Sequence, residues 1–128
     1  MESRKSIAAQ KKAGGKYNCA QSVATTYADY MGVSEEMAQE VTAAFGTGMG
    51  NMEGTCGALI GAGVVIGMVK KDRMEARRQM KVMMQKFQER NGATQCKALK
   101  GVGTGKCLRD CNDCVADAAE FLEEILHG

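Results

Sequence analysis

The sequence predicts an all-α fold: a single-domain bundle of about six helices with glycine-rich connecting loops. The 128 residues contain no proline, apolar residues recur at helical spacing, and strand-like alternation is nearly absent. Hydrophobic residues make up 45% of the chain and aromatic residues only 5%, with ten methionines. The core is therefore built from aliphatic side chains and methionine, which suit packed helices. This length fits one domain, residues 1–128.

Capping residues and glycines mark the helix boundaries in order along the chain. Asn18 is a good N-cap, and Gln21 stands where a capping box requires it. Ser34 caps the following helix, while Gly32 and Gly92 are placed to end helices. The first helix is mostly polar, so residues 1–15 can be peripheral. The predicted helices span residues 3–13, 18–31, 34–45, 56–69, 72–90, 94–99 and 107 or 111 to 126.

Glycines concentrate in the helix predicted at residues 56–69 and in the loop before it. Each helical glycine costs up to about 1 kcal/mol relative to alanine, but it lets another helix or a ligand approach the backbone closely. Gly57 and Gly61 are therefore candidate contacts for a cofactor. The loop, residues 46–54, lacks the preceding strand and the G-K-[ST] of a phosphate-binding loop. A tight loop that passes close to a cysteine site explains it at least as well.

Four of the six cysteines lie where a helix is predicted to begin. They are Cys19, Cys56, Cys96 and Cys111, each one or two residues after a capping residue. A helix N-terminus carries unpaired N–H groups and a partial positive charge. This field favours the thiolate, the form of cysteine that attacks disulfides and binds metals. The repeated arrangement predicts thiol or metal–sulfur chemistry at these four residues.

The last three cysteines form a second pattern. Cys107, Cys111 and Cys114 have the spacing C-x3-C-x2-C, which places them on one face of a helix. Thiolates at this spacing can hold three irons of a cubane cluster. Burial on the apolar face explains Cys114 equally well. His127 is the only histidine and lies at the end of the chain, so we expect no role for it as a ligand or base.

Composition limits the classes of function. The net charge of +2 is too small to indicate nucleic-acid binding. No secretory signal is recognisable near the N-terminus, and the longest apolar run is shorter than a membrane span of roughly 18 residues. We expect a cytoplasmic protein that has no membrane segment and is compatible with a homodimer. Cytosolic thiols are normally reduced, so six cysteines favour redox or metal chemistry over structural disulfides.

Several basic residues lie near cysteines in sequence. They are Lys16, Lys97, Lys106 and Arg109. Ordinary solvated surface is the favoured interpretation for these charges.

Four motifs together resemble a known family. They are Y-N-C-A-Q-S-V at residues 17–23, F-G-T-G-M-G leading into T-C-G-A-L-I-G at 55–61, C-K-A-L at 96–99, and Cys111 followed by Val115 and D-A-A-E at 117–120. The combined pattern, from Tyr17 to Leu126, is similar to the C-GCAxxG-C-C family of redox-active proteins. The resemblance implies a helical fold, a redox role and the same four cysteines as the site. Cys107 and Cys114 are additions to the family pattern.

Three hypotheses remain open at this point. In the first, Cys19, Cys56, Cys96 and Cys111 form the catalytic centre of a dithiol–disulfide or electron-transfer protein that works with an unidentified redox partner. Cys19 and Cys56 are the preferred low-pKa thiolates. In the second, ligands from among all six cysteines hold an iron–sulfur cluster, or less favourably zinc, which usually uses paired C-x2-C knuckles. In the third, the protein is a non-redox helical interaction module with buried cysteines.

Overall fold

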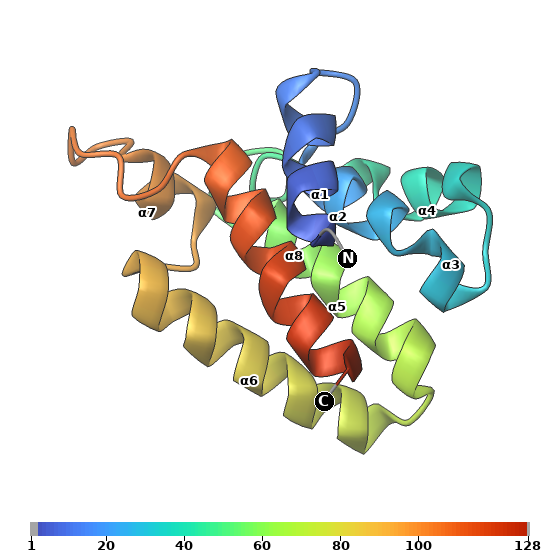
Figure 1. The fold of residues 1–128 in the computed structure, drawn as a ribbon. Coiled ribbons are helices and arrows are strands. Elements are labelled where there is room, and N and C mark those ends of the chain that lie inside the picture. The colour runs from blue at the N-terminus through green and yellow to red at the C-terminus, as the bar shows by residue number, and fades with distance from the viewer. Residues whose placement is uncertain (1–2, 128) are drawn as a thin grey trace.

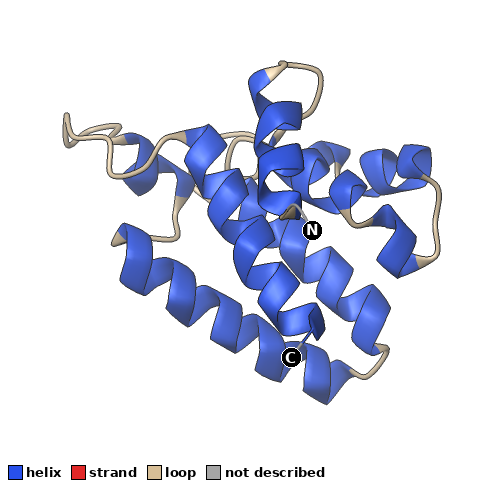
Figure 2. Cartoon of the chain, in the orientation of Figure 1, coloured by secondary structure: helices blue, strands red, loops and turns tan. Residues whose placement is uncertain are grey.

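The computed structural model describes residues 3–127, which form eight α-helices, one 3₁₀ helix and no strand beyond the isolated bridge Thr55–Gln95. The all-α prediction is confirmed (Figure 2). The elements are α1 (Arg4–Ala13), α2 (Cys19–Thr26), α3 (Ala28–Met31), α4 (Glu35–Val41), η1 (Ala43–Phe45), α5 (Gly57–Lys70), α6 (Arg73–Asn91), α7 (Cys96–Lys100) and α8 (Cys111–His127).

The helices α5 and α8 form the centre of the molecule (Figure 1). The helix α1 packs along α8, α2 packs against α5, and α6 packs against both α5 and α8. Leu59, Ile66, Phe87 and Leu122 are fully buried in the core that these helices share. The short helices α3 and α4 lie on one side of the bundle and α7 on the opposite side. This arrangement gathers the N-terminal ends of α2, α5, α7 and α8 in one region.

The close contact between α2 and α5 depends on Gly61. A Cβ atom at this position would lie 2.5 Å from the carbonyl oxygen of Ala20 and 3.0 Å from its Cα, which is closer than atoms can pack. The missing side chain thus serves helix packing. Gly61 faces α2 and is not among the residues that line the cavity described below, so its role as a cofactor contact stays a prediction.

Most predicted helix starts are confirmed at atomic detail. The Asn18 side chain accepts a hydrogen bond from the backbone of Gln21, whose side chain accepts one from the Asn18 backbone. Ser34 caps α4 through its hydroxyl. At α5 the N-cap position is held by Cys56 itself, one residue later than the expected cap at Thr55.

Two expectations need correction because tertiary contacts override local sequence. The helix predicted at residues 18–31 breaks at Tyr27, whose φ is −115°. Tyr27 is fully buried and donates a 2.8 Å hydrogen bond to the carbonyl of Ala119 on α8. The first helix is not peripheral, because Ala8 is fully buried and α1 packs against α8 and α2.

No helix within residues 3–127 has both the length and the apolar character needed to cross a bilayer.

Candidate functional site

Five of the six cysteines line one cavity of about 60 Å³. They come from four helices that are far apart in sequence, and four of the five side chains are buried. Cys111 is the half-buried member. The five residues are Cys19, Cys56, Cys96, Cys111 and Cys114.

The four cysteines that sequence analysis placed at helix starts do stand at helix starts. Cys19, Cys96 and Cys111 are the first residues of α2, α7 and α8, and Cys56 is the N-cap of α5. The carboxylate of Asp110 accepts a 2.7 Å hydrogen bond from the Asn112 backbone at the start of α8. The helix ends therefore converge, and their partial positive charges face the same thiols.

Backbone hydrogen bonds hold Cys56 beside Cys96. The Cys56 N–H donates to the carbonyl of Thr94 at 2.7 Å, and the Cys96 N–H donates to the carbonyl of Gly54 at 3.0 Å. A Cβ on Gly48 would lie 2.5 Å from the Cβ of Cys96. The loop of residues 46–54 thus passes its backbone directly along the cysteine site, as sequence analysis expected.

Gly57 allows Cys19 to approach Cys56. A Cβ at this glycine would lie 2.6 Å from the carbonyl oxygen of Phe45 and 3.3 Å from the Cβ of Cys19. Gly57 also lines the cavity, unlike Gly61. Any side chain here would push α2 away from α5 and separate the two cysteines.

Comparison with known proteins identifies one family for this chain. A family model described as "Putative redox-active protein (C_GCAxxG_C_C)" matches residues 17–125. The chain belongs to this family. Comparison with curated proteins and with solved structures found no match. All four cysteines carried over from the C_GCAxxG_C_C pattern line the cavity, and Cys114 adds a fifth thiol to them.

In this family member, Cys19 and Cys111 form a proton-sharing pair. A hydrogen bond from Cys19 lowers the pKa of Cys111 to about 6; burial opposes this shift, and the charges of Lys100 and Lys12 add to it. The same hydrogen bond, together with burial, raises the pKa of Cys19. Sequence analysis expected the low pKa at Cys19, and the structure places it at Cys111. Cys111 is the less buried of the two thiols, and both Lys100 and Lys12 lower its pKa.

Cys56 and Cys114 form a second pair. The hydrogen bond from Cys114 lowers the pKa of Cys56, burial opposes it, and the N–H groups of Ala58 and Leu59 at the start of α5 assist. The pKa of Cys114 is raised by the same hydrogen bond and by burial. The low pKa expected at Cys56 agrees with this direction. Cys96 stands outside both pairs, and burial raises the pKa of its thiol.

Sequence analysis missed two cations of the site. Lys12, at the end of α1, and Lys100, at the end of α7, line the cavity. Burial alone would lower the pKa of Lys100, but the thiolates, Cys111 foremost, raise it overall. Only the tertiary arrangement brings Lys12 to cysteines on other helices, so no local sequence signal identifies it. Arg109, which sequence analysis assigned to solvated surface, also lines the cavity.

Arg109 is held by a buried carboxylate. Its Nε and Nη2 donate to the two carboxylate oxygens of Asp117 at 2.9 and 3.1 Å, and Asp117 is only 4% exposed. The carbonyl oxygen of Arg109 lies 3.9 Å from the sulfur of Cys114. Asp117 thus positions the segment that carries Arg109 into the site.

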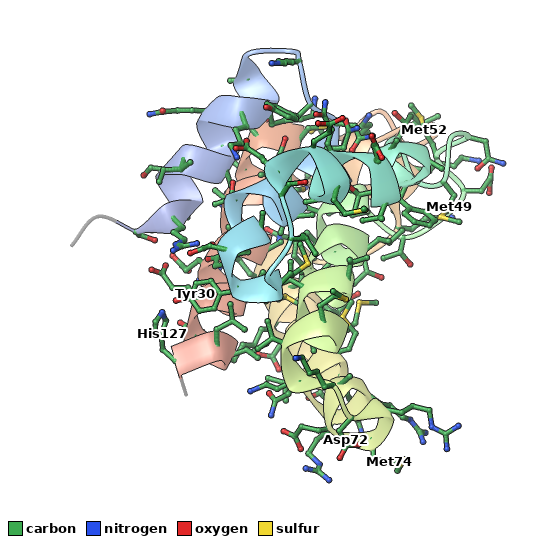
Figure 3. All side chains as sticks on the ribbon, turned by 90° about the vertical axis from the view of Figure 1, so that its right-hand side faces the viewer. Tyr30, Met49, Met52, Asp72, Met74 and His127 are labelled. Carbon is green, nitrogen blue, oxygen red and sulfur yellow. The ribbon has the colours of Figure 1, made fainter. Side chains whose placement is uncertain are left out.

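The remaining predicted candidates lie elsewhere. Cys107 is exposed on the segment between α7 and α8, which projects from the bundle (Figure 1). His127 pairs with Tyr30, its Nε2 3.0 Å from the phenol oxygen, and the two side chains face one another in Figure 3. His127 ends the 17-residue α8 whose first residue is Cys111. It therefore stands a helix length of roughly 25 Å from the cysteines.

Among residues 3–127, no three Cys, His, Asp or Glu side chains are grouped so that they could hold a metal ion. The pKa values of the thiols instead link Cys19 with Cys111 and Cys56 with Cys114, and Cys96 stands apart.

Proposed function

We propose that the protein is a dithiol–disulfide redox protein in which Cys111 is the nucleophile and Cys19 the resolving thiol. One observation carries the proposal: α2 and α8 bring a half-buried Cys111 against a buried Cys19, with two lysines beside them. A thiolate flanked by a thiol that can displace it is the arrangement that thiol–disulfide exchange requires. The redox description of the family agrees with this function.

The chemistry balances with the two cysteines and one electrophile. The Cys111 thiolate attacks one atom of a weak single bond in the substrate, and the other atom leaves with the bonding electron pair. Cys19 then gives its proton to the leaving group and attacks the sulfur of Cys111. The bond from Cys111 to the substrate breaks, a Cys19–Cys111 disulfide forms, and two electrons have passed to the substrate.

The second pair provides a route for reduction. Cys56 and Cys114 line the same cavity, so the Cys56 thiolate can attack the Cys19–Cys111 disulfide. The exchange regenerates the first dithiol and leaves a Cys56–Cys114 disulfide. A dithiol protein partner is then the reductant that closes the cycle. Cys96 is the unpaired thiol of the site, and it packs against the loop of residues 46–54.

The test is stoichiometric oxidation of the reduced protein with hydrogen peroxide, followed by peptide mapping. Peroxide converts a thiolate to a sulfenic acid, which a neighbouring thiol condenses to a disulfide. The Cys111→Ser variant should lose fast peroxide consumption, and Cys19→Ser should accumulate the sulfenic acid at Cys111. Cys107→Ser is the matched control, because Cys107 is a cysteine of the same segment that does not line the cavity. Equal rates for Cys111→Ser and wild type would refute the assignment.

A second candidate function is iron–sulfur cluster binding as an electron carrier or sensor. The observation in its favour is that five cysteines line one cavity. Since they are not grouped for a metal ion as placed, their side chains would have to turn. Anaerobic purification with iron and acid-labile sulfide assays separates the two functions. Matching iron and sulfide in the same sample would establish the cluster and remove the dithiol proposal.

A further inference from the structure

The size and the charge of the cysteine cavity indicate what kind of substrate it can hold. Its volume of about 60 Å³ holds roughly four to six water-sized atoms, taking about 10–15 Å³ for each. The cavity between the thiols can therefore hold a ligand of a few non-hydrogen atoms.

The lining of the cavity is cationic. Lys12, Lys100 and Arg109 contribute to it and no Asp or Glu does. Arg109 is neutralised by Asp117. Within the described residues 3–127, neither Lys12 nor Lys100 forms an ion pair with a carboxylate. Two lysine charges therefore face the cavity with thiolates as their only anionic neighbours.

This charge is what an anionic substrate needs. A thiolate that attacks an anion meets repulsion, and the two lysines that line the cavity offset it. The lysines lower the pKa of Cys111 whatever the oxidant is, but only an anionic substrate is also attracted by their charge. Among small anions, those with a sulfur–sulfur bond react with thiolates by the same exchange that the two cysteines perform on each other.

We infer that the cavity binds a small anionic sulfane-sulfur compound, hydropersulfide or inorganic polysulfide, which Cys111 and Cys19 reduce to sulfide. This inference rests on the proposed dithiol function and names its substrate class. Lys12 and Lys100 hold the anion beside Cys111.

The reaction balances for the shortest member of the class. The Cys111 thiolate attacks the unprotonated sulfur of HS–S⁻. The sulfur–sulfur bond breaks, HS⁻ leaves with the bonding electron pair, and Cys111 carries a persulfide. Cys19 then attacks the Cys111 sulfur, and its proton goes to the departing sulfur as a second HS⁻. The products are one Cys19–Cys111 disulfide and two HS⁻, so the substrate gains two electrons and the dithiol loses two.

The experiment treats the anaerobic, reduced full-length protein with inorganic polysulfide and measures sulfide release and disulfide formation. Wild type and Cys107→Ser should both form the Cys19–Cys111 disulfide with release of sulfide. Cys19→Ser should stop at a Cys111 peptide carrying one extra sulfur atom. If polysulfide leaves Cys111 unmodified while peroxide still forms the disulfide, the substrate class is wrong and the dithiol function stands. If neither reagent forms the disulfide, the dithiol function itself fails.

A charge variant tests the recognition of the anion. Lys12→Gln should lower the rate with polysulfide about tenfold relative to the rate with neutral peroxide, the size of one lost charge-assisted hydrogen bond. Lys97→Gln is the control, because the Nζ of Lys97 lies 3.6 Å from Oε1 of Glu53 and Lys97 does not line the cavity. Equal losses with both reagents in Lys12→Gln would mean that the lysine acts only on the thiolate, which would overturn anion recognition.

Discussion

At the scale of single residues, the chemistry of the site depends on which member of each cysteine pair carries the negative charge. The hydrogen bond shared with Cys19, and after it the charges of Lys100 and Lys12, lower the pKa of the half-buried Cys111, whereas the same hydrogen bond and burial raise the pKa of Cys19. The proton therefore rests on Cys19. This division gives the site a nucleophile at the accessible position and a protonated thiol behind it, which is the order that attack and resolution require.

The pH dependence of alkylation follows from this division. Since the pKa of Cys111 is about 6, its thiolate forms as the pH rises through that value. Iodoacetamide should modify Cys111 with a midpoint near pH 6, reach a plateau by neutral pH, and slow as the pH falls below the midpoint. Peptide mass spectrometry at each pH measures the rate. A midpoint near the ordinary cysteine value of about 8.5 would contradict the assignment.

Lys100 is expected to tune this midpoint. Its ammonium group lowers the pKa of Cys111 both by its charge and by a hydrogen bond, so Lys100→Met should move the alkylation midpoint upward from about 6 toward about 8.5. The control Lys97→Met removes a lysine of the same short helix that faces Glu53 and should leave the midpoint in place. The same pH series of iodoacetamide rates measures both variants, and an unmoved midpoint in Lys100→Met would exclude this role.

At the scale of elements, the site exists because α2 and α5 can touch. Gly61 and Gly57 let the two helices cross at backbone distance, and this contact places Cys19 next to Cys56. The loop of residues 46–54 then fixes Cys96 through hydrogen bonds between backbone groups. The glycines that weaken α5 as an isolated helix are therefore the ones that assemble the cavity.

Two alanine substitutions in α5 separate the role of glycine in helix contact from its cost to helix stability. Gly61→Ala places a methyl group 2.5 Å from the carbonyl of Ala20 and should lower the free energy of unfolding by about 2 kcal/mol. Gly67→Ala meets nothing within 4 Å and should raise it by about 0.5–1 kcal/mol. Urea unfolding followed by circular dichroism measures both. Similar effects of the two substitutions would show that α2 and α5 do not pack as described.

At the scale of the whole molecule, Asp117 ties three segments together. Its Oδ1 accepts a 2.9 Å hydrogen bond from Nη1 of Arg90 in α6, and its Oδ2 accepts one of 2.9 Å from Nε of Arg109, which precedes α8. The arginines are 39% and 36% exposed at their side chains, while that of Asp117 is 5% exposed. The bundle is thereby closed on the side that carries Arg109 to the cysteines.

Removing the Asp117 charge should destabilise the fold. Asp117→Asn leaves two arginines facing a neutral buried amide and should cost about 2–3 kcal/mol, less than a fully buried pair because the arginines reach solvent. Glu124→Gln is the control, since its pair with Lys86 is half-exposed and contributes at most about 0.5 kcal/mol. Thermal unfolding compares the stability of the two variants. Equal losses of stability would show that Asp117 does not hold the three segments together.

What the sequence could predict was mostly local. The capping box of Asn18 and the placement of four cysteines at helix starts depend on neighbours along the chain, and both were predicted correctly. The break at Tyr27 could not be predicted, because it depends on a hydrogen bond to Ala119, which lies 92 residues away. Lys12 and the pairing of Cys19 with Cys111 were missed for the same reason.

The most direct test of the central claim is a map of the disulfides formed when the reduced protein is oxidised by one equivalent of hydrogen peroxide. The structure predicts a Cys19–Cys111 disulfide as the first product, in both wild type and Cys107→Ser. A first product that contains Cys107, or a Cys111 that remains unpaired while other cysteines oxidise, would contradict the pairing of α2 with α8 as the redox centre.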